Sequence, residues 1–194
     1  MMADWLAERR GEVAAEAILD AAEALFTERG AANVGMHDIA RASGCSRATL
    51  YRYFENRDAL YAAYVHREAH RVFADLAERI PRTGDRSERL LAGLTTALRS
   101  VRESPALSSW FVATQRPLGG EMAERSEVIG ALTESFLASL DLDDVARRAR
   151  WLVRVLVSLL VFPGRNADDE RTMLQQFVLP AVLAPTLLSE RDSG

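Results

Sequence analysis

Four arginines are concentrated between positions 39 and 57, and their chemistry is the clearest functional signal in the chain. Arg41, Arg47, Arg52 and Arg57 are opposed there by Glu55 alone, although the whole chain of 194 residues has a formal net charge of −4. A guanidinium group can bind a phosphate oxygen or the O6 and N7 atoms of guanine. A local basic stretch on an acidic protein fits a nucleic-acid footprint, and it fits a solvated helix face equally well.

A second candidate for chemistry is the pair His66 and His70. Two histidines four residues apart on a helix can share a metal ion, which would make the protein a metal-dependent sensor or an enzyme. In zinc hydrolases a glutamate follows the first histidine, whereas Arg67 stands there in this chain. The remaining histidine is His37, so a solvated helix face is the favoured interpretation. The single cysteine, Cys45, excludes internal disulfides. We expect no catalytic residue, no metal and no cofactor.

Two short helices joined by a tight turn must position the arginines. Helices are predicted at about 36–43 and 47–54, and the residues expected to touch where they cross are apolar: Ile39, Ala40, Leu50 and Phe54. Gly44 can adopt the left-handed conformation that ends the first helix. Ser46 can cap the second helix by accepting a hydrogen bond from the backbone N–H of Thr49. This arrangement is a helix-turn-helix, which lays its second helix in a DNA major groove.

A set of residues at fixed spacing extends this motif over positions 18–60. It comprises Ile18 to Ala22, Leu25, Phe26, Gly30, Ile39, Ala40, Ser46, Thr49, Leu50, Tyr51, Tyr53, Phe54 and Leu60. The set resembles the DNA-binding domain of the tetracycline-repressor (TetR) family, whose members are homodimeric, ligand-responsive transcription factors and mostly repressors. Gly35 stands where the family usually has a threonine that caps a helix and can bind phosphate, and Cys45 replaces the usual valine. Glycine is an acceptable N-cap, so the helix should still form.

Within this motif the residues at the start of the second helix are the expected DNA contacts. Arg47 points outward from the first turn and can bond guanine, while Tyr51, one turn later, can touch a thymine methyl group or a phosphate. The resemblance implies phosphate contacts for Thr49 and Tyr53, and Arg57 should bind phosphate from a helix N-terminus. The complete predicted DNA-binding set is His37, Ser46, Arg47, Ala48, Thr49, Tyr51, Arg52, Tyr53 and Arg57.

Apolar residues recur at helical spacing along the rest of the chain, and no segment reads as a strand. The pattern predicts a long helix at about 57–80, a break at 81–85, and further helices around 90–101, 129–140, 143–162 and 168–188. We therefore predict an all-α protein. A three-helix DNA-binding domain at 1–60 is joined by the long helix to a ligand-binding and dimerisation domain at 61–194.

The second domain is expected to supply an effector pocket and a dimer interface. The resemblance implies a ligand cavity, for which the candidates are Leu98, Trp110, Phe111, Gln115 and Phe136, and the scarcity of polar groups among them predicts a small hydrophobic effector. The helix at 143–162 is apolar on almost all sides and must be covered. Pairing of the last two helices across a two-fold axis would place these residues in the interface: Leu152, Leu156, Leu159 and Phe177.

Composition restricts the class of protein to which this chain can belong. Hydrophobic residues make up 48% of the chain and charged residues 27%, which is typical of a globular domain. The densest apolar run, at 155–162, is much shorter than the roughly 20 residues of a membrane span, and the charged start does not resemble a signal peptide. We expect a cytoplasmic protein without a membrane contact.

Three functions are compatible with these patterns. The first is a homodimeric regulator, a repressor that binds a palindromic DNA operator and responds to a ligand. The second is the metal-dependent sensor or enzyme built on His66 and His70. The third is an all-α interaction module whose helix-turn-helix has lost DNA binding, an alternative that the departure at Gly35 keeps open.

Overall fold

The computed structural model describes residues 2–112 and 118–185. These residues form helices and no strand, as the sequence predicted. The helices are α1 (Met2–Arg29), α2 (Met36–Ala42), α3 (Arg47–Tyr53), α4 (Arg57–Arg79), α5 (Arg86–Glu103), α6 (Pro105–Ser108), α7 (Leu118–Arg125), α8 (Glu127–Ala138), α9 (Val145–Val161), α10 (Ala167–Met173) and α11 (Leu179–Leu183). Within the described residues, none is long and apolar enough to span a bilayer.

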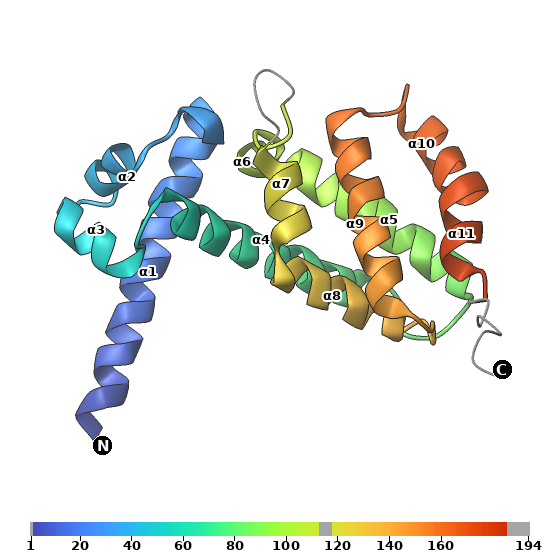
Figure 1. Cartoon of the computed structure of the whole chain (residues 1–194), viewed down its shortest axis with the longest axis horizontal. Helices are drawn as coiled ribbons and strands as arrows, with labels where there is room; N and C mark the ends of the chain where they lie inside the picture. The colour runs from blue at the N-terminus through green and yellow to red at the C-terminus, as the bar shows by residue number, and fades with distance from the viewer. Residues whose placement is uncertain (1, 113–117, 186–194) are drawn as a thin grey trace, which may run out of the picture.

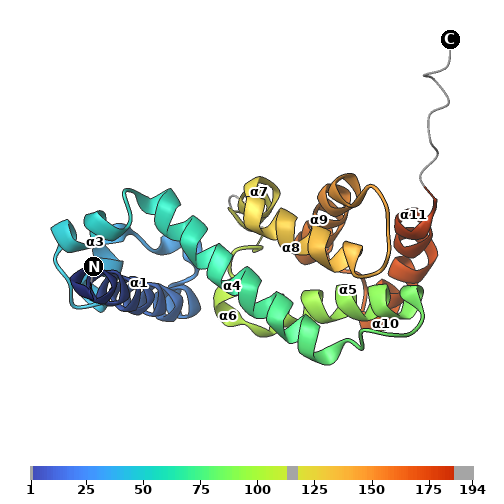
Figure 2. The ribbon, with the colours of Figure 1, turned by 90° about the horizontal axis from the view of Figure 1, so that it is seen from below.

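The molecule is elongated, and α4 connects its two ends (Figures 1 and 2). Helices α1 to α3 form the N-terminal end, with α1 packed against α2, α3 and the start of α4. Helix α6 packs against α1. The helices that follow it, together with α5, form the other end, where α8 and α9 pack against each other and α5 lies against α4, α9 and α11. Because α4 is one uninterrupted helix, a change in its orientation would displace residues at both ends of the molecule.

Local capping determines where the short helices begin and end. Gly30 has φ 75°, a left-handed conformation that ends α1 without a Cβ clash. The Ser46 side chain accepts from the Thr49 amide at 3.0 Å, which confirms the predicted cap of α3. Asn56 caps α4 in the same way, accepting from the amide of Ala59 at 2.8 Å. These contacts satisfy amide groups that a helix start leaves without partners.

Two apolar cores hold the fold together, and α4 contributes to the first of them beyond the predicted boundary at residue 60. The N-terminal core includes Phe26 and Leu50, and it extends to Tyr61, Tyr64 and Trp110. Trp110 stacks on Tyr64 with ring centroids 5.8 Å apart and an interplanar angle of 13°. The segment around α6 therefore packs against the DNA-binding helices, although it lies about fifty residues later in the chain.

The second core lies among α5, α8, α9 and α11, where leucines pack on one another. A partly buried ion pair lies beside this core: Arg102 donates to both carboxylate oxygens of Glu170, at 2.6 and 2.7 Å. The Glu170 carboxylate also accepts from the Gly164 amide at 2.8 Å. The bonds to Arg102 tie α5 to α10, and the bond to Gly164 ties α10 to the turn that precedes it.

The last predicted helix, at 168–188, is interrupted in the structure. A π-helical turn at Leu174–Val178 separates α10 from α11, and residues beyond 185 lie outside the described part of the chain. Pro180 is the second residue after this turn. Because proline has no amide proton and its ring crowds the preceding turn, a wider turn before it is a common accommodation.

Candidate nucleic-acid interface and apolar cavity

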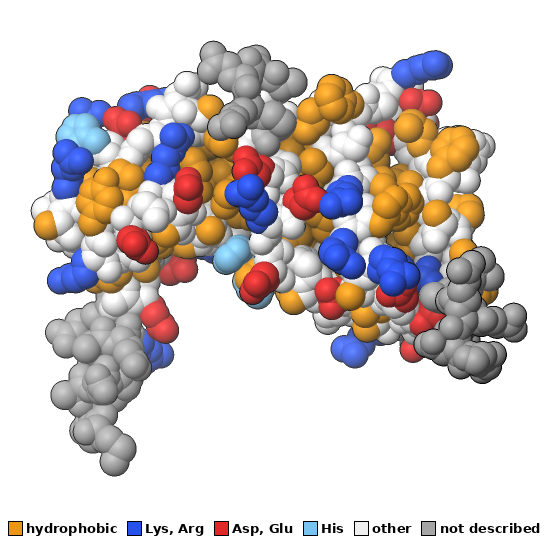
Figure 3. All heavy atoms as spheres, in the orientation of Figure 1, with side chains coloured by type: hydrophobic (Ala, Val, Ile, Leu, Met, Phe, Trp, Pro, Cys, Tyr) orange, Lys and Arg blue, Asp and Glu red, His pale blue; other side chains and the backbone are white. Residues whose placement is uncertain are grey.

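The exposed face of α2 and α3 carries most of the predicted DNA contacts. Exposed on it are the side chains of His37, Ser46, Arg47, Ala48, Tyr51 and Arg52, whereas Thr49 and Tyr53 are half-buried. Arginine and histidine side chains gather at this end of the molecule (Figure 3). The helix beneath them is fixed by Leu50, which is fully buried in the N-terminal core. The structure thus presents α3 as a solvent-facing helix with two exposed arginines, Arg47 and Arg52.

Arg47 stands out among the arginines of this face. Among the described residues it has no hydrogen bond or ion pair, so its guanidinium is free to meet a base or a phosphate. Arg41, in contrast, lies 3.5 Å from Asp38, and Arg52 lies 3.4 Å from the hydroxyl of Tyr53. The predicted role of Arg47 is therefore compatible with its surroundings.

Arg57 has an intramolecular role that the sequence did not reveal. Its Nη2 donates to the carbonyl oxygens of Ala31 and Ala32, at 3.3 and 3.2 Å, and its guanidinium lies 4.7 Å from the centre of the Tyr61 ring. The Tyr61 hydroxyl lies 2.7 Å from the carbonyls of both Ala31 and Val34. Burial raises the pKa of Tyr61, so it remains a hydroxyl donor. Arg57 thus anchors the segment that leads into the helix-turn-helix.

Neither departure from the family pattern disturbs the motif. The backbone amide of Gly35 donates to Oδ2 of Asp38 at 3.1 Å, which provides half of a capping box for α2. The Cys45 sulfur is half-buried against the N-terminal core and accepts from the Ser43 hydroxyl at 3.2 Å. Both helices consequently form without the threonine and the valine that are usual in the family.

A network of ion pairs joins α1 to α4, and sequence reasoning missed it. Arg67 lies 2.7 Å from Asp20 and from Glu23, 3.1 Å from Glu16, and 3.3 Å from Glu68. The side chains of Arg67 and Glu68 are only 9% and 8% exposed. Burial raises the pKa of Glu68, although Arg71 and Arg67 oppose the increase. Glu16, Asp20 and Glu23 are spaced so that they share one face of α1, and this spacing could have indicated a basic partner for that face.

The histidine pair finds no third metal-ligating side chain within residues 2–112 and 118–185. Burial, with a smaller contribution from His70, lowers the pKa of His66. In the described part of the chain, no group of three histidine, cysteine or carboxylate side chains is arranged to hold a metal ion. The residue between the pair, Arg67, points instead to the carboxylates of α1. No observation therefore favours the metal-dependent alternative.

A small apolar cavity of about 140 Å³ lies where α4, α5, α8 and α9 meet the segment around α6 and α7. Trp110 and Phe111, two of the predicted ligand residues, line it. Other lining residues are apolar as well and include Val65, Val72, Val101, Ile129, Val153 and Leu156. Glu68 is the one charged lining residue in the described chain. The indole nitrogen of Trp110 is buried without a hydrogen-bond partner among the described residues.

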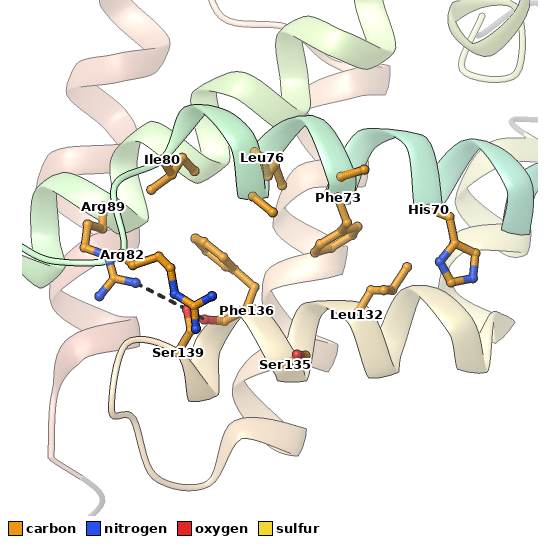
Figure 4. Close-up of a pocket in the computed structure, with 12 residues that line it drawn as sticks. His70, Phe73, Leu76, Ile80, Arg82, Arg89, Leu132, Ser135, Phe136 and Ser139 are labelled. Carbon is orange, nitrogen blue, oxygen red and sulfur yellow. Dashed lines mark hydrogen bonds between the residues drawn. The ribbon is translucent and has the colours of Figure 1, made fainter.

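The other predicted ligand residues lie elsewhere. Leu98 is 3% exposed and belongs to the second core, where it does not line the cavity. Phe136 lines a different and larger groove between α4 and α8 (Figure 4). Gln115 lies outside the described residues. Helical periodicity identified Leu98 and Phe136 as inward-facing but could not assign them to one space. Leu98, which packs in the second core, is a correction to the predicted pocket, whereas a ligand role for Phe136 stays a prediction.

The predicted dimer residues divide in a similar way. Leu152 and Leu159 are 1% and 7% exposed and belong to the core of the protomer, which corrects their assignment to an interface. Leu156 is half-buried and lines the apolar cavity. Phe177 is 67% exposed. Other exposed apolar side chains on these last helices and the turn after α9 are Trp151, Phe162 and Met173.

A basic helix-turn-helix on an otherwise helical protein defines a DNA-binding transcription regulator, and comparison with known proteins agrees. Residues 18–64 match the family described as bacterial regulatory proteins, tetR family. The chain is 55% identical to the HTH-type transcriptional regulator Rv1255c of Mycobacterium tuberculosis, and the alignment covers 98% of this chain and 96% of that one. The chain belongs to the TetR family of transcriptional regulators.

Solved structures share the fold. AlkX from a Dietzia species, a TetR family repressor, superposes with a TM-score of 0.61 at 24% identity, over 86% of this chain and 94% of that one. RolR in complex with resorcinol superposes with a TM-score of 0.69 at 20% identity, over 90% and 88% of the respective chains. At these identities the similarity concerns the fold.

Proposed function

We propose that the protein is a homodimeric repressor that binds a palindromic operator through α3 and releases it when a small apolar molecule occupies the cavity beside Trp110. This role is transcriptional and not catalytic, and we expect it to be exercised in the cytoplasm, where the DNA is. The DNA contacts would come from the predicted set on α2 and α3, with Arg47 reading a base and the others contacting phosphates.

The observation that carries the proposal is the position of α4. Its first turns belong to the DNA-binding core through Tyr61 and Tyr64, and its following turns line the apolar cavity through Val65, Ala69 and Val72. A ligand that moves this wall of the cavity would also move the helices attached to the start of α4. Binding at the two sites would then be coupled, in the range of about 1–3 kcal/mol that is usual for such pairs of sites.

The volume of the cavity limits the effector. An apolar cavity of about 150 Å³ in an engineered protein binds benzene. A cavity of about 140 Å³ with Glu68 as its one charged wall residue is therefore expected to admit a compound with one aromatic ring or a short aliphatic chain. The unpaired indole N–H of Trp110 could donate one hydrogen bond to it.

The dimer is supported by the exposed apolar side chains of the last helices. Trp151 and Phe177 are 42% and 67% exposed, and large apolar side chains left exposed on the surface are candidates for an interface. In a two-fold dimer paired through this surface, the two α3 helices would lie about 34–36 Å apart, or a multiple of that, so that they could enter successive major grooves.

The proposal is tested in two steps. Selection from random DNA duplexes should first yield a palindromic sequence, and fluorescence anisotropy should then show that single-ring aromatic compounds weaken its binding. Ala97→Leu fills the cavity from α5 and should abolish the response to the compound while DNA binding persists. Ala92→Leu, on the same helix but outside the cavity, is the matched control. Recovery of no DNA sequence would reject the operator, and an unchanged response in Ala97→Leu would reject the cavity.

A further inference from the structure

A second hollow, separate from the apolar cavity, lies between the C-terminal half of α4 and α8 (Figure 4). Its volume is about 580 Å³, within the range of roughly 300–1,000 Å³ that is usual for ligand sites. Phe73, Leu76, Leu132 and Phe136 form an apolar floor along it. Among the described residues, Phe73 alone lines both this groove and the apolar cavity, so its ring stands between the two spaces.

One end of the groove is positively charged. Arg82 and Arg89 lie together there beside Ser139, and His70 lies at the opposite end (Figure 4). No aspartate or glutamate of the described chain lines the groove. Two neighbouring guanidinium groups without a carboxylate are unusual on a protein whose net charge is −4, because acidic partners are abundant elsewhere.

The hydrogen bonds of these two arginines are incomplete. Arg82 makes no hydrogen bond or ion pair with any residue in 2–112 or 118–185. Nε of Arg89 is buried without an acceptor, and its Nη2 makes one long bond of 3.4 Å to the Ser139 hydroxyl. That hydroxyl donates its own proton to the Phe136 carbonyl at 2.7 Å. A buried guanidinium nitrogen without an acceptor is costly, and an anion is the group that would satisfy it.

We propose that this groove binds an amphipathic organic anion, with a carboxylate head at Arg82 and Arg89 and a hydrocarbon tail along Phe73, Leu132 and Phe136. Arg89 would exchange its long bond to Ser139 for the carboxylate, and a guanidinium group can present Nε and one Nη to the two carboxylate oxygens together. The part of α4 from His70 to Arg79 runs along the groove and is about 14 Å long, which suits a tail of medium length. The observations that support this site involve neither the ligand of the apolar cavity nor the operator, so the site stands apart from the proposed function.

Calorimetric titration with decanoate, below the concentration at which it forms micelles, tests the proposal. Decanoate should bind saturably, and 1-decanol, which has the same tail and no charge, should bind at least tenfold more weakly. Arg82→Gln and Arg89→Gln should each weaken decanoate binding about tenfold, as expected for loss of a charge-assisted hydrogen bond. Arg82 is exposed and unpaired, so its replacement should leave the fold intact even if that of Arg89 does not.

Arg86→Gln is the matched control, because Arg86 is exposed at the start of α5 and does not line the groove. Its decanoate affinity should equal that of the unmodified protein. Equal affinity for decanoate and decanol, or an equal effect of the Arg82 and Arg86 substitutions, would overturn the proposal. Absence of decanoate binding would overturn it as well, and none of these results would bear on operator binding.

Discussion

Arg67 should be the residue whose replacement most weakens the attachment of α1 to α4. It lies within 3.3 Å of four carboxylates, three of them on α1 and one, Glu68, next to it on α4. Arg67→Gln keeps most of the side-chain volume but removes the charge. The variant leaves Glu68 buried, with Arg71 at 2.7 Å as its remaining cationic partner.

The magnitude follows from burial. The carboxylates of Glu16 and Asp20 are 58% and 66% exposed, so each of these pairs contributes only about 0.2–1 kcal/mol. Loss of one partner from a buried pair costs about 3–5 kcal/mol, and the pairing of Glu68 with Arg71 should reduce that cost. We expect a decrease of about 3 kcal/mol in the free energy of unfolding, which corresponds to a decrease in Tm of roughly 6–12 °C for a chain of this size.

The decrease should depend on pH in a defined direction. The pKa of Glu68 is already raised by burial, and loss of Arg67 should raise it further. A carboxyl whose pKa is higher in the folded state than in the unfolded state opposes folding once the pH exceeds its folded-state pKa. The difference in the free energy of unfolding between the variant and the unmodified protein should therefore be largest at neutral pH. It should decrease as the pH falls through the folded-state pKa of Glu68.

Urea unfolding followed by circular dichroism, at neutral and mildly acidic pH, measures both effects. Arg71→Gln is the matched control, because Arg71 contacts Glu23 and Glu68 as well but is 51% exposed, and it should cost less than about 1 kcal/mol. Equal destabilisation by the two substitutions, or a deficit that does not change with pH, would refute the assignment of a buried anchoring role to Arg67.

Three further predictions concern the DNA contact, the second core and the dimer. Arg47→Ala should reduce affinity by about 1–3 kcal/mol mainly at one base pair of each half-site, and an equal loss on every operator variant would assign it to phosphate instead. Glu170→Gln should lower the free energy of unfolding by about 2–3 kcal/mol at pH 7. This is less than the cost of about 3–5 kcal/mol for breaking a fully buried pair, because the partner Arg102 is 35% exposed and its charge is partly solvated. The hydrogen bonds from Arg102 lower the pKa of Glu170 below that of an ordinary glutamate. In thermal melts the difference between the variant and the unmodified protein should therefore be full above the ordinary glutamate pKa and disappear as the pH falls through the lowered pKa of Glu170. Phe177→Arg should give monomers in sedimentation, whereas an unchanged dimer would exclude that face.

The helix-turn-helix could be predicted from the sequence because its determinants are local. Gly44, with φ 68°, and the Ser46 cap act within a few residues of their own positions. The apolar positions Ile39, Leu50 and Phe54 are buried as their spacing indicated. Local geometry alone therefore identified α3 as the exposed basic helix.

Tertiary structure decided how the remaining side chains are shared among core, cavity and surface. Periodicity marked Leu98, Phe136 and Leu152 as apolar positions of helices, but it cannot say which helix covers them. Leu98 and Leu152 pack in the second core, and Phe136 faces a groove. Likewise, the sequence shows Arg67 only as a charged residue between two histidines, whereas in the structure Asp20 of α1 lies 2.7 Å from it. A sequence pattern reports the face of a helix, whereas burial, pairing and cavities depend on the element that packs against that face.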